Sequence, residues 1–322
     1  MEKRIGITMG DAAGVGPEII LKVMDRYRDE AVIYGSFDVL AVCNERFGCN
    51  YVLKRIDNAQ QAEAGKVNVI DVTGLKCADF TVGQLSALCG ESAFRFLERA
   101  ISDAMEQKIS AIVTCPLNKE ALRMAGHDYA GHTEILRDLT GADRCAMLLW
   151  SEKLKTIHVS THVSLAEAIR RVSKERIVEV TRLAHDILIK AGFSEPRIAV
   201  AGLNPHAGEN GLFGREEIDE IIPAVRQLTA EGLNVSGPLS PDVVFLKCAR
   251  GEYDLVVAMY HDQGHIPLKL ADFDGGVNIT CGLPIIRTSV DHGTAFDIAG
   301  RFIAREDSLL KAIEAARMIA GQ

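Results

Sequence analysis

The stretch IGITMGDAAGVGPEII, residues 5–20, decides the fold class of this chain. It starts as a short apolar strand, passes through a loop that contains Gly10, Gly14 and Gly16, and continues from Pro17 with helical spacing. Glycine permits positive φ angles and a close backbone approach, and proline fits the first turn of a helix. A strand, a tight loop and a helix in succession form the first unit of an α/β domain. The glycine spacing fits neither the Rossmann fingerprint nor the P-loop, so a plain structural turn also explains this loop.

The alternation of short apolar runs with longer amphipathic runs continues through all 322 residues, which is the α/β pattern. Strand-like runs lie at 4–9, 31–35, 67–72, 110–115, 145–150, 156–161, 197–203, 255–260 and 277–280. Helix-like runs lie at 16–27, 37–47, 83–107, 118–125, 133–140, 164–170, 174–191, 215–231, 240–249 and 307–320. No long linker interrupts them, so we expect two lobes joined by strands that cross between them. The first lobe is predicted to comprise 1–130 and 270–322, and the second 131–269.

The composition indicates a soluble globular protein that acts on a small molecule. The chain is 48% hydrophobic and 25% charged, and its net charge of −8 without basic tracts argues against a nucleic-acid or membrane partner. None of the eight cysteines forms a C-x-x-C pair, and most lie in apolar contexts, so we expect free thiols and a cytoplasmic protein. A catalytic cysteine is disfavoured because none has a base beside it in sequence.

Three histidines stand where a strand-like run stops and a polar loop is expected to start. They are His162, His206 and His261. In an open α/β sheet, ligands bind at the carboxyl ends of the strands, and three imidazoles meeting there would hold a metal with open positions for substrate. A structural histidine explains each one singly, but their joint placement favours a metal site. Asp262 is then a candidate to orient an imidazole from behind.

Several further residues suit an anionic substrate. Lys269, Asn278 and Arg287 lie near predicted strand ends and loops, where a cation can bind phosphate or carboxylate, although a surface ion pair explains each charged one singly. Thr133 is predicted to cap the helix that follows it, where open N–H groups also suit phosphate, and capping does not explain the neighbouring His132. The loop 290–300 is small and polar enough for a flat cofactor group, and equally for a plain loop.

The chain resembles the 4-hydroxythreonine-4-phosphate dehydrogenase family over essentially its whole length. The matching segments are ITMGDAAGVGPEII, TCPLNKEAL, AGHTEIL, VSTHVSL, GLNPHAGENGLFG, AMYHDQGHIPLK, GVNITCGLP and RTSVDHGTAFDIAG. Within the family it looks closer to the branch that acts on four-carbon sugar acids, the D-threonate or D-erythronate 4-phosphate dehydrogenases. The segments HDQGHIPLK and PHAGENGLFG favour that branch.

The resemblance implies the two-lobed α/β/α fold of isocitrate and isopropylmalate dehydrogenases, where GDGIGPE and HGSAPDIAG are similar to GDAAGVGPE and HGTAFDIAG here. That fold binds a nicotinamide cofactor without a Rossmann glycine pattern. It therefore implies NAD, with NADP as the alternative, beside His292, Gly293 and Asp297 of the first lobe. It places the active site in the cleft between the lobes, with metal and dimer contacts on the second.

By the same resemblance, the metal ligands are His162, His206 and His261, and the substrate contacts are His132, Thr133, Lys269, Asn278 and Arg287. The family is dimeric, and the neighbouring subunit completes each active site. Three nitrogens suit zinc, cobalt or manganese better than magnesium. Lys269 is also the candidate general base, because burial and a nearby cation both lower the pKa of a lysine.

The implied reaction is a metal-assisted oxidative decarboxylation of a four-carbon 3-hydroxy acid phosphorylated at C4. For 4-phospho-D-threonate or 4-phospho-D-erythronate the product is dihydroxyacetone phosphate. The alternative substrate is 4-phosphohydroxy-L-threonine, in pyridoxal phosphate synthesis, which carries an amine at C2 in place of a hydroxyl. A metal-dependent phosphohydrolase would show phosphate release without NAD, and a sensor protein would need an output domain for which the chain has no room.

Overall fold

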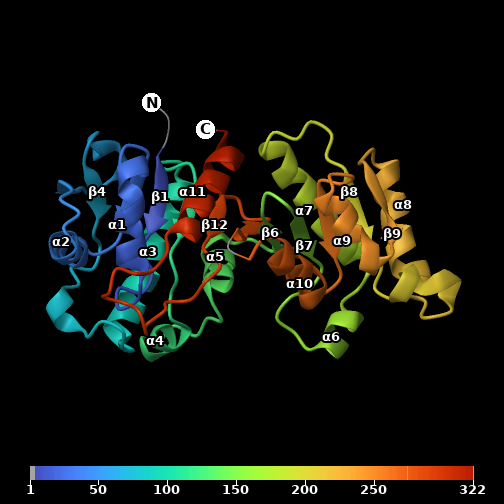
Figure 1. Ribbon diagram of the computed structural model, residues 1–322, viewed down its shortest axis with the longest axis horizontal. Coiled ribbons are helices and arrows are strands. Elements are labelled where there is room, and N and C mark those ends of the chain that lie inside the picture. The colour runs from blue at the N-terminus through green and yellow to red at the C-terminus, as the bar shows by residue number, and fades with distance from the viewer. Residues whose placement is uncertain (1–3, 274, 322) are drawn as a thin grey trace. The chain divides into compact units, whose positions relative to one another are not determined.

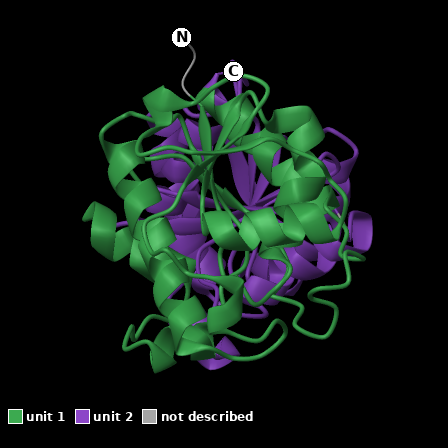
Figure 2. Ribbon diagram, turned by 90° about the vertical axis from the view of Figure 1, so that its left-hand side faces the viewer, with its two compact units in different colours: residues 1–143, 283–320, 322 green, residues 144–282, 321 purple. Residues whose placement is uncertain are grey.

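The computed structural model describes residues 4–273 and 275–321, which form two compact units (Figures 1 and 2). Unit 1 contains the chain up to Asp143 and again from Leu283 to Ala320, and unit 2 contains Arg144–Gly282. Residues 1–3, 274 and 322, which belong to the predicted first lobe, lie outside the described residues. The cofactor and metal roles assigned to the two lobes stay a prediction.

Unit 1 is built on a parallel sheet with the strand order β3-β4-β2-β1-β5-β12. Its strands are β1 (Ile5–Thr8), β2 (Ala31–Tyr34), β3 (Leu53–Arg55), β4 (Val67–Ile70), β5 (Ile112–Thr114) and β12 (Arg287–Ser289). Its helices are α1 (Gly16–Tyr27), α2 (Phe37–Arg46), α3 (Ala87–Met105), α4 (Lys119–Met124), α5 (His132–Thr140) and α11 (Asp307–Ala320), with 3-10 turns at Ala59–Gln61 and Cys77–Asp79.

The inner strands of unit 1 are continuous buried runs, as expected where helices cover a parallel sheet. Every residue of β1, β2, β4 and β5 is buried. Helix α3 packs against β1, β2 and β5, and α11 packs against β1, β5 and β12. The strand, glycine loop and helix read from residues 5–20 are therefore present as β1 and α1.

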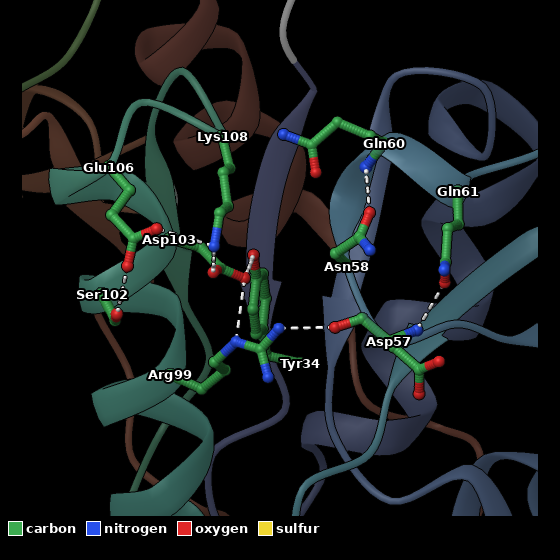
Figure 3. A network of polar contacts seen from close by, with 10 residues as sticks. All are labelled: Tyr34, Asp57, Asn58, Gln60, Gln61, Arg99, Ser102, Asp103, Glu106 and Lys108. Carbon is green, nitrogen blue, oxygen red and sulfur yellow. Dashed lines mark hydrogen bonds and ion pairs between the residues drawn. The ribbon is translucent and has the colours of Figure 1, made fainter.

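A buried carboxylate joins α3 to β2 (Figure 3). The side chain of Asp103, 1% exposed, accepts hydrogen bonds from the Tyr34 hydroxyl at 2.9 Å, from Arg99 Nε at 3.1 Å and from Lys108 Nζ at 3.3 Å. Because a buried charge costs free energy unless it is paired, the two cations and the phenol keep this carboxylate in the interior. Burial and the adjacent Asp103 charge raise the pKa of Tyr34.

Unit 2 has the strand order β11-β6-β7-β10-β8-β9. Its strands are β6 (Ala146–Trp150), β7 (Lys155–His158), β8 (Ile198–Ala201), β9 (Val235–Leu239), β10 (Leu255–Ala258) and β11 (Val277–Cys281). Its helices are α6 (Leu165–Arg170), α7 (Lys174–Lys190), α8 (Ile222–Ala230), α9 (Pro241–Ala249) and α10 (His261–Ala271), with a 3-10 segment at Pro205–Gly211 and a π turn at Glu217–Ile221.

The strands that precede the three histidines are parallel neighbours in unit 2. Strand β10 pairs with β7 on one side and with β8 on the other, both in parallel, so their carboxyl ends lie at one edge of the sheet. The antiparallel strands β6 and β11 extend the sheet beyond β7. The expectation that His162, His206 and His261 follow strands that end together is thus confirmed at the level of topology.

Five elements expected or missed in the sequence need correction. The helix expected at 83–107 begins only at Ala87, because Ser86 caps it by accepting the backbone N–H of Cys89. The helix expected at 215–231 is a π turn followed by α8. Arg287 follows the strand-like run 283–286 and was expected to end a strand, but it begins β12, since Pro284 in that run has no N–H to give to a sheet. Strands β3 and β9 have no apolar alternation and were missed.

The largest correction concerns the polar segment after β10, which was expected to be a loop and is the first turn of α10. One of its polar side chains makes hydrogen bonds with backbone groups just beyond the ends of β10 and β8. Gln263, 8% exposed, accepts the N–H of Met259 at 2.6 Å and donates to the carbonyl of Gly202 at 2.8 Å. The segment is polar because it ties helix α10 to the ends of β10 and β8, and polarity alone could not distinguish that from a loop.

None of the described helices combines the length and the apolar composition needed to cross a lipid bilayer. All eight cysteines are described and carry free thiols. Burial raises the pKa of the Cys43, Cys89 and Cys248 thiols to about 12, 12 and 11, so these groups are protonated and poor nucleophiles.

Candidate active site

His162 and His261 lie together at the carboxyl edge of the unit 2 sheet. Their ring centres are 5.8 Å apart, and His261 is the first residue of α10. The Nδ1 atom of His261 lies 2.6 Å from Oδ1 of Asp262, the carboxylate predicted to orient it. That contact leaves Nε2 as the nitrogen of His261 that can bind a metal or substrate atom. A pair of imidazoles with a carboxylate behind one of them is a donor set that fits a divalent transition metal.

His206 lies on another segment of unit 2, the 3-10 turn Pro205–Gly211. It follows β8, its side chain is 64% exposed, and its Nδ1 lies 3.5 Å from Oε2 of Glu209. Residues 206–210 all have φ between 43° and 80°, which is the left-handed region. Each non-glycine residue there costs on the order of 1 kcal/mol, and such residues gather at functional sites.

The structure thus brings two of the three predicted ligands into contact within the chain. Over residues 4–273 and 275–321, no three histidine, cysteine, aspartate or glutamate side chains of the chain are grouped so that they could hold a metal ion. The metal site itself stays a prediction. Its chemistry is supported by the His162–His261 pair, and the position of its third ligand needs a separate explanation.

Two more histidines join this pair, and neither was among the residues predicted for the site. His265 stacks on His261 with ring centres 3.6 Å apart, and lies 4.7 Å from the ring of His158. His158 is 1% exposed, and burial lowers its pKa to about 3, so its ring is neutral at physiological pH. His265 could have been found from the sequence, because positions i and i+4 share a face once the segment is known to be a helix.

Gly264 explains how α10 approaches β7 so closely. A Cβ on this residue would lie 2.6 Å from Oγ1 of Thr156 and closer still to Nε2 of His158. Any larger side chain would therefore push α10 away from β7. Since α10 begins with His261, the glycine also fixes how near His261 lies to His162.

Lys269 and Asn278, the two predicted substrate contacts of unit 2, come from α10 and β11. Lys269 lies eight residues after His261, on the same helix face, and its Nζ is 5.6 Å from the centre of the Phe273 ring. The Oδ1 atom of Asn278 is buried and has no hydrogen-bond partner among the described residues, so it can accept a hydrogen bond from a ligand. The role of Lys269 as a base stays a prediction.

The remaining predicted substrate contacts gather in unit 1. Arg287, 3% exposed, donates from Nη2 to Oγ1 of Thr114 at 2.7 Å across the parallel pair β5 and β12. Burial lowers its pKa to about 9, so it keeps its charge at neutral pH. Burial, followed by the charges of Arg287 and Lys119, holds the pKa of His132 well below its ordinary value. The set therefore offers a buried cation beside a neutral imidazole, which suits an anion.

Helix α5 begins at His132, with Gly131 as its cap and no capping side chain, so the predicted capping role of Thr133 is wrong. His132 and Thr133 instead occupy the first two positions of the helix, where the backbone N–H groups point out of its end. Such groups and the helix dipole favour a bound anion. The absent cap leaves this helix end open to a ligand.

Lys119 is the candidate site residue that sequence reasoning missed. It is the first residue of α4, it is exposed, and its Cε lies 3.6 Å from where a Cβ on Gly131 would stand. It therefore adds a second cation to the end of α5. The signal available in the sequence was its position shortly after the end of the strand predicted at 110–115, which is where ligand-binding loops begin.

The predicted cofactor loop lies along the first glycine loop within unit 1. The backbone N–H of Val15 donates to the carbonyl of Thr294 at 3.0 Å, and a Cβ on Gly14 would lie 2.7 Å from the same oxygen. The carboxylate of Glu18, 2% exposed, accepts the N–H groups of Gly300 and Phe302. The backbone of Thr294 thus comes too close to residue 14 for a side chain, which explains the glycine at this position.

The three predicted cofactor residues, His292, Gly293 and Asp297, are exposed on that loop. The Nδ1 atom of His292 lies 2.9 Å from the carbonyl of Gly293. Their assignment to the nicotinamide cofactor stays a prediction. The loop that carries them is nevertheless anchored by hydrogen bonds to the Glu18 carboxylate and from the backbone N–H of Val15.

Asp11 of the first loop should make the stability of the protein depend on pH. It is 1% exposed, its Oδ2 has no hydrogen-bond partner among the described residues, and burial raises its pKa from 3.8 to about 6. A raised pKa means that the folded state loses stability as the pH rises through 6. Asp11→Asn should therefore raise the free energy of unfolding by up to about 3 kcal/mol at pH 8.

The same substitution should have little effect at pH 4, where Asp11 is largely protonated in the folded protein. Urea unfolding at both pH values measures the difference, and Asp38→Asn, at the start of α2, is the control. An equal increase in the free energy of unfolding at both pH values would show that the charge of Asp11 is not the cause.

Comparison with known proteins identifies close relatives of the chain. The family model described as "Pyridoxal phosphate biosynthetic protein PdxA" matches residues 27–316. The D-threonate 4-phosphate dehydrogenase of Cupriavidus necator is 49% identical over 316 residues, which cover 96% of this chain and 95% of that protein. The 4-hydroxythreonine-4-phosphate dehydrogenase of Beijerinckia indica is 45% identical over 320 residues, covering 98% and 95%.

Comparison with solved structures finds proteins with the same names. The crystal structure of a 4-hydroxythreonine-4-phosphate dehydrogenase from Klebsiella pneumoniae has a TM-score of 0.90 to the chain at 47% identity, and the match covers 100% of this chain and 99% of that one. These neighbours have the isocitrate dehydrogenase-like α/β fold, so the fold type predicted from the sequence is confirmed.

Proposed function

The chain belongs to the PdxA family of pyridoxal phosphate biosynthetic proteins, whose relatives are named as dehydrogenases, and on that premise we propose that it oxidises a phosphorylated four-carbon hydroxy acid. The proposed substrate is 4-phospho-D-threonate or 4-phospho-D-erythronate, and the products are dihydroxyacetone phosphate and CO2. The observation that carries the proposal is the buried Arg287, which lies with His132 and Lys119 at the open end of α5.

The anion set of unit 1 would hold a charged end of this substrate. Arg287 supplies a charged fork, Lys119 a second cation, and the first N–H groups of α5 complete the contacts to phosphate or carboxylate oxygens. His132 stays neutral beside these cations, so it donates or accepts a hydrogen bond without adding charge. These groups orient the substrate and take no part in the bond changes.

The histidine set of unit 2 would hold the reacting carbon. His162 and His261, with His206, are the proposed ligands of a divalent metal, and the buried Oδ1 of Asn278 would accept a hydrogen bond from the substrate. A metal held by these residues would supply Lewis-acid stabilisation of the C3 oxygen, and NAD would take the hydride from C3, so that the 3-keto acid formed could lose CO2. Lys269 is the proposed acceptor of the hydroxyl proton.

A second copy of the chain is the proposed source of the third metal ligand. Unit 2 exposes many large apolar side chains on α6, α9, α10 and nearby segments, which suits a contact between subunits. They are Leu165, Ile169, Leu212, Phe213, Val243, Leu246, Ile266, Leu270 and Phe273. A homodimer through this surface would bring His206 of one subunit to the His162–His261 pair of the other.

The two candidate substrates differ at C2, where one carries a hydroxyl and the other an amine. Relatives with either name are similar to the chain, with slightly higher identity to the one named for D-threonate 4-phosphate. The sugar-acid substrate is therefore preferred, and 4-phosphohydroxy-L-threonine is the second candidate. A site built to bond one of these groups can discriminate strongly against the other.

The test is NADH formation at 340 nm with purified protein, NAD and a divalent metal, with 4-phospho-D-threonate, 4-phospho-D-erythronate and 4-phosphohydroxy-L-threonine in parallel. We expect a kcat/KM for one of the first two that exceeds the third by at least about 10²-fold. Highest activity on the amine would favour the second candidate. No turnover of any of them, or release of phosphate without NADH, would contradict the proposal.

A further inference from the structure

The turn that carries His206 keeps a backbone that its own sequence does not favour. His206, Ala207, Glu209 and Asn210 are not glycines, and all have positive φ together with Gly208 between them. Each L-residue in this region is strained relative to the right-handed conformation, and the few local backbone hydrogen bonds of the run do not remove that strain, so contacts from outside the run are expected to help hold it. The structure shows one side chain that contacts the chain on both sides of His206.

That side chain is Glu217, the first residue of the π turn. It is 2% exposed, and its Oε1 accepts the backbone N–H groups of Leu203 and Asn204, each at 2.7 Å. Its Oε2 accepts the side-chain amide of Asn204 at 2.9 Å, and lies 2.7 Å from where a Cβ on Gly208 would stand. The carboxylate therefore fixes the two residues before Pro205 and touches the second residue after His206.

The neighbouring acidic residues do not share this position. Glu216 accepts a hydrogen bond from the same amide of Asn204 at 2.7 Å, but it is only half-buried, and the backbone N–H groups of Leu203 and Asn204 go to Glu217 instead. Glu209 is 53% exposed and lies on the turn itself. Glu217 accepts three N–H groups of Leu203 and Asn204, just before the turn, which is how a buried carboxylate is kept in the interior.

We propose that Glu217 is a positioning residue that holds the left-handed turn 206–210, so that the imidazole of His206 stands ready for the metal. The proposal rests on the proposed function insofar as it takes His206 to be a metal ligand. Groups behind metal ligands commonly contribute a factor of about 10 to 100 in metal affinity, and Glu217 acts in the same way through the backbone.

The first measurement needs no metal and no substrate. Hydrogen exchange of residues 203–210 in the metal-free protein should become about tenfold faster or more in Glu217→Gln, while the strands of unit 2 keep their protection. Glu216→Gln is the matched control, because it removes a charge from the same amide of Asn204 and should leave the exchange of the turn unchanged. Unchanged exchange in Glu217→Gln would overturn the proposal.

The second measurement is the affinity for Co²⁺, read from its visible spectrum and by calorimetry. Glu217→Gln should weaken binding about 10- to 100-fold in wild-type background and have no further effect when combined with His206→Ala. Additive losses in the double variant would mean that Glu217 only supports the fold, and would overturn the proposal. Gly208→Ala keeps the carboxylate but displaces it, and should reproduce the loss if Glu217→Gln folds poorly.

The role of Glu217 in holding the turn and the role of His206 as a metal ligand can be refuted separately. If His206→Ala leaves Co²⁺ affinity unchanged, His206 is not a ligand and that part of the proposed function fails. The hydrogen exchange of the turn then decides by itself whether Glu217 holds it, because that readout involves neither metal nor catalysis.

Discussion

His206→Ala is expected to remove the bound metal and to lower kcat/KM by about 10³-fold or more, since Lewis-acid stabilisation of the developing charge contributes several kcal/mol. Metal content by elemental analysis and NADH formation measure the two effects. His206 is exposed and stands on a turn, so its loss should not unfold the protein, and an unchanged thermal midpoint is the control. Full metal content together with full activity would remove His206 from the site.

A mixing experiment extends this expectation to the dimer. His206→Ala and His162→Ala should each be inactive alone. If His206 joins the His162–His261 pair of the other subunit, unfolding and refolding the two variants together should restore about a quarter of wild-type activity, because half of the dimers are mixed and each mixed dimer has one intact site. His162→Ala mixed with His261→Ala should stay inactive, since those two rings lie together in one chain. Absence of recovery in every mixture would contradict a shared site.

Arg287→Met should give the second large loss, about 10²- to 10³-fold in kcat/KM, because truncating a buried charge that binds an oppositely charged group costs about 2–5 kcal/mol. The effect should lie mainly in KM, since the guanidinium orients the substrate and does not take part in bond changes. Arg123→Met, on the exposed side of α4, is the matched control and should change neither constant.

Comparing 4-phospho-D-threonate with unphosphorylated D-threonate tells which end of the substrate Arg287 holds. A contact to phosphate predicts that Arg287→Met affects only the phosphorylated substrate. A contact to the carboxylate predicts equal losses for both. A kcat/KM that is unchanged for both substrates in the variant, with the control also unchanged, would exclude Arg287 from the binding site.

The sequence predicted the elements whose apolar spacing repeats, and missed those whose side chains serve a neighbour. Strand β1, helix α1 and the three strands before the histidines could be predicted because burial selects their residues directly. The start of α10 could not, since Gln263 is polar in order to satisfy the ends of β8 and β10, and no local pattern expresses that contact.

The same limit applies to the site. His162 and His261 could be identified from the strands that they follow, whereas the importance of Glu217 depends on N–H groups thirteen and fourteen residues away in the chain. Lys119 was missed for a related reason, because its only link to His132 is through space. Sequence reasoning finds residues that sit at the end of a predicted element, and it misses those that act on another segment.

Helix α10 would limit how the proposed site of this protein can change its substrate. His261, His265 and Lys269 occupy successive turns on one face, about 5–6 Å apart along the axis, and Gly264 fixes the whole helix against β7. None of the three can move relative to the others without unwinding the helix. In the proposed site, a change of substrate length would therefore have to be accommodated by residues outside α10.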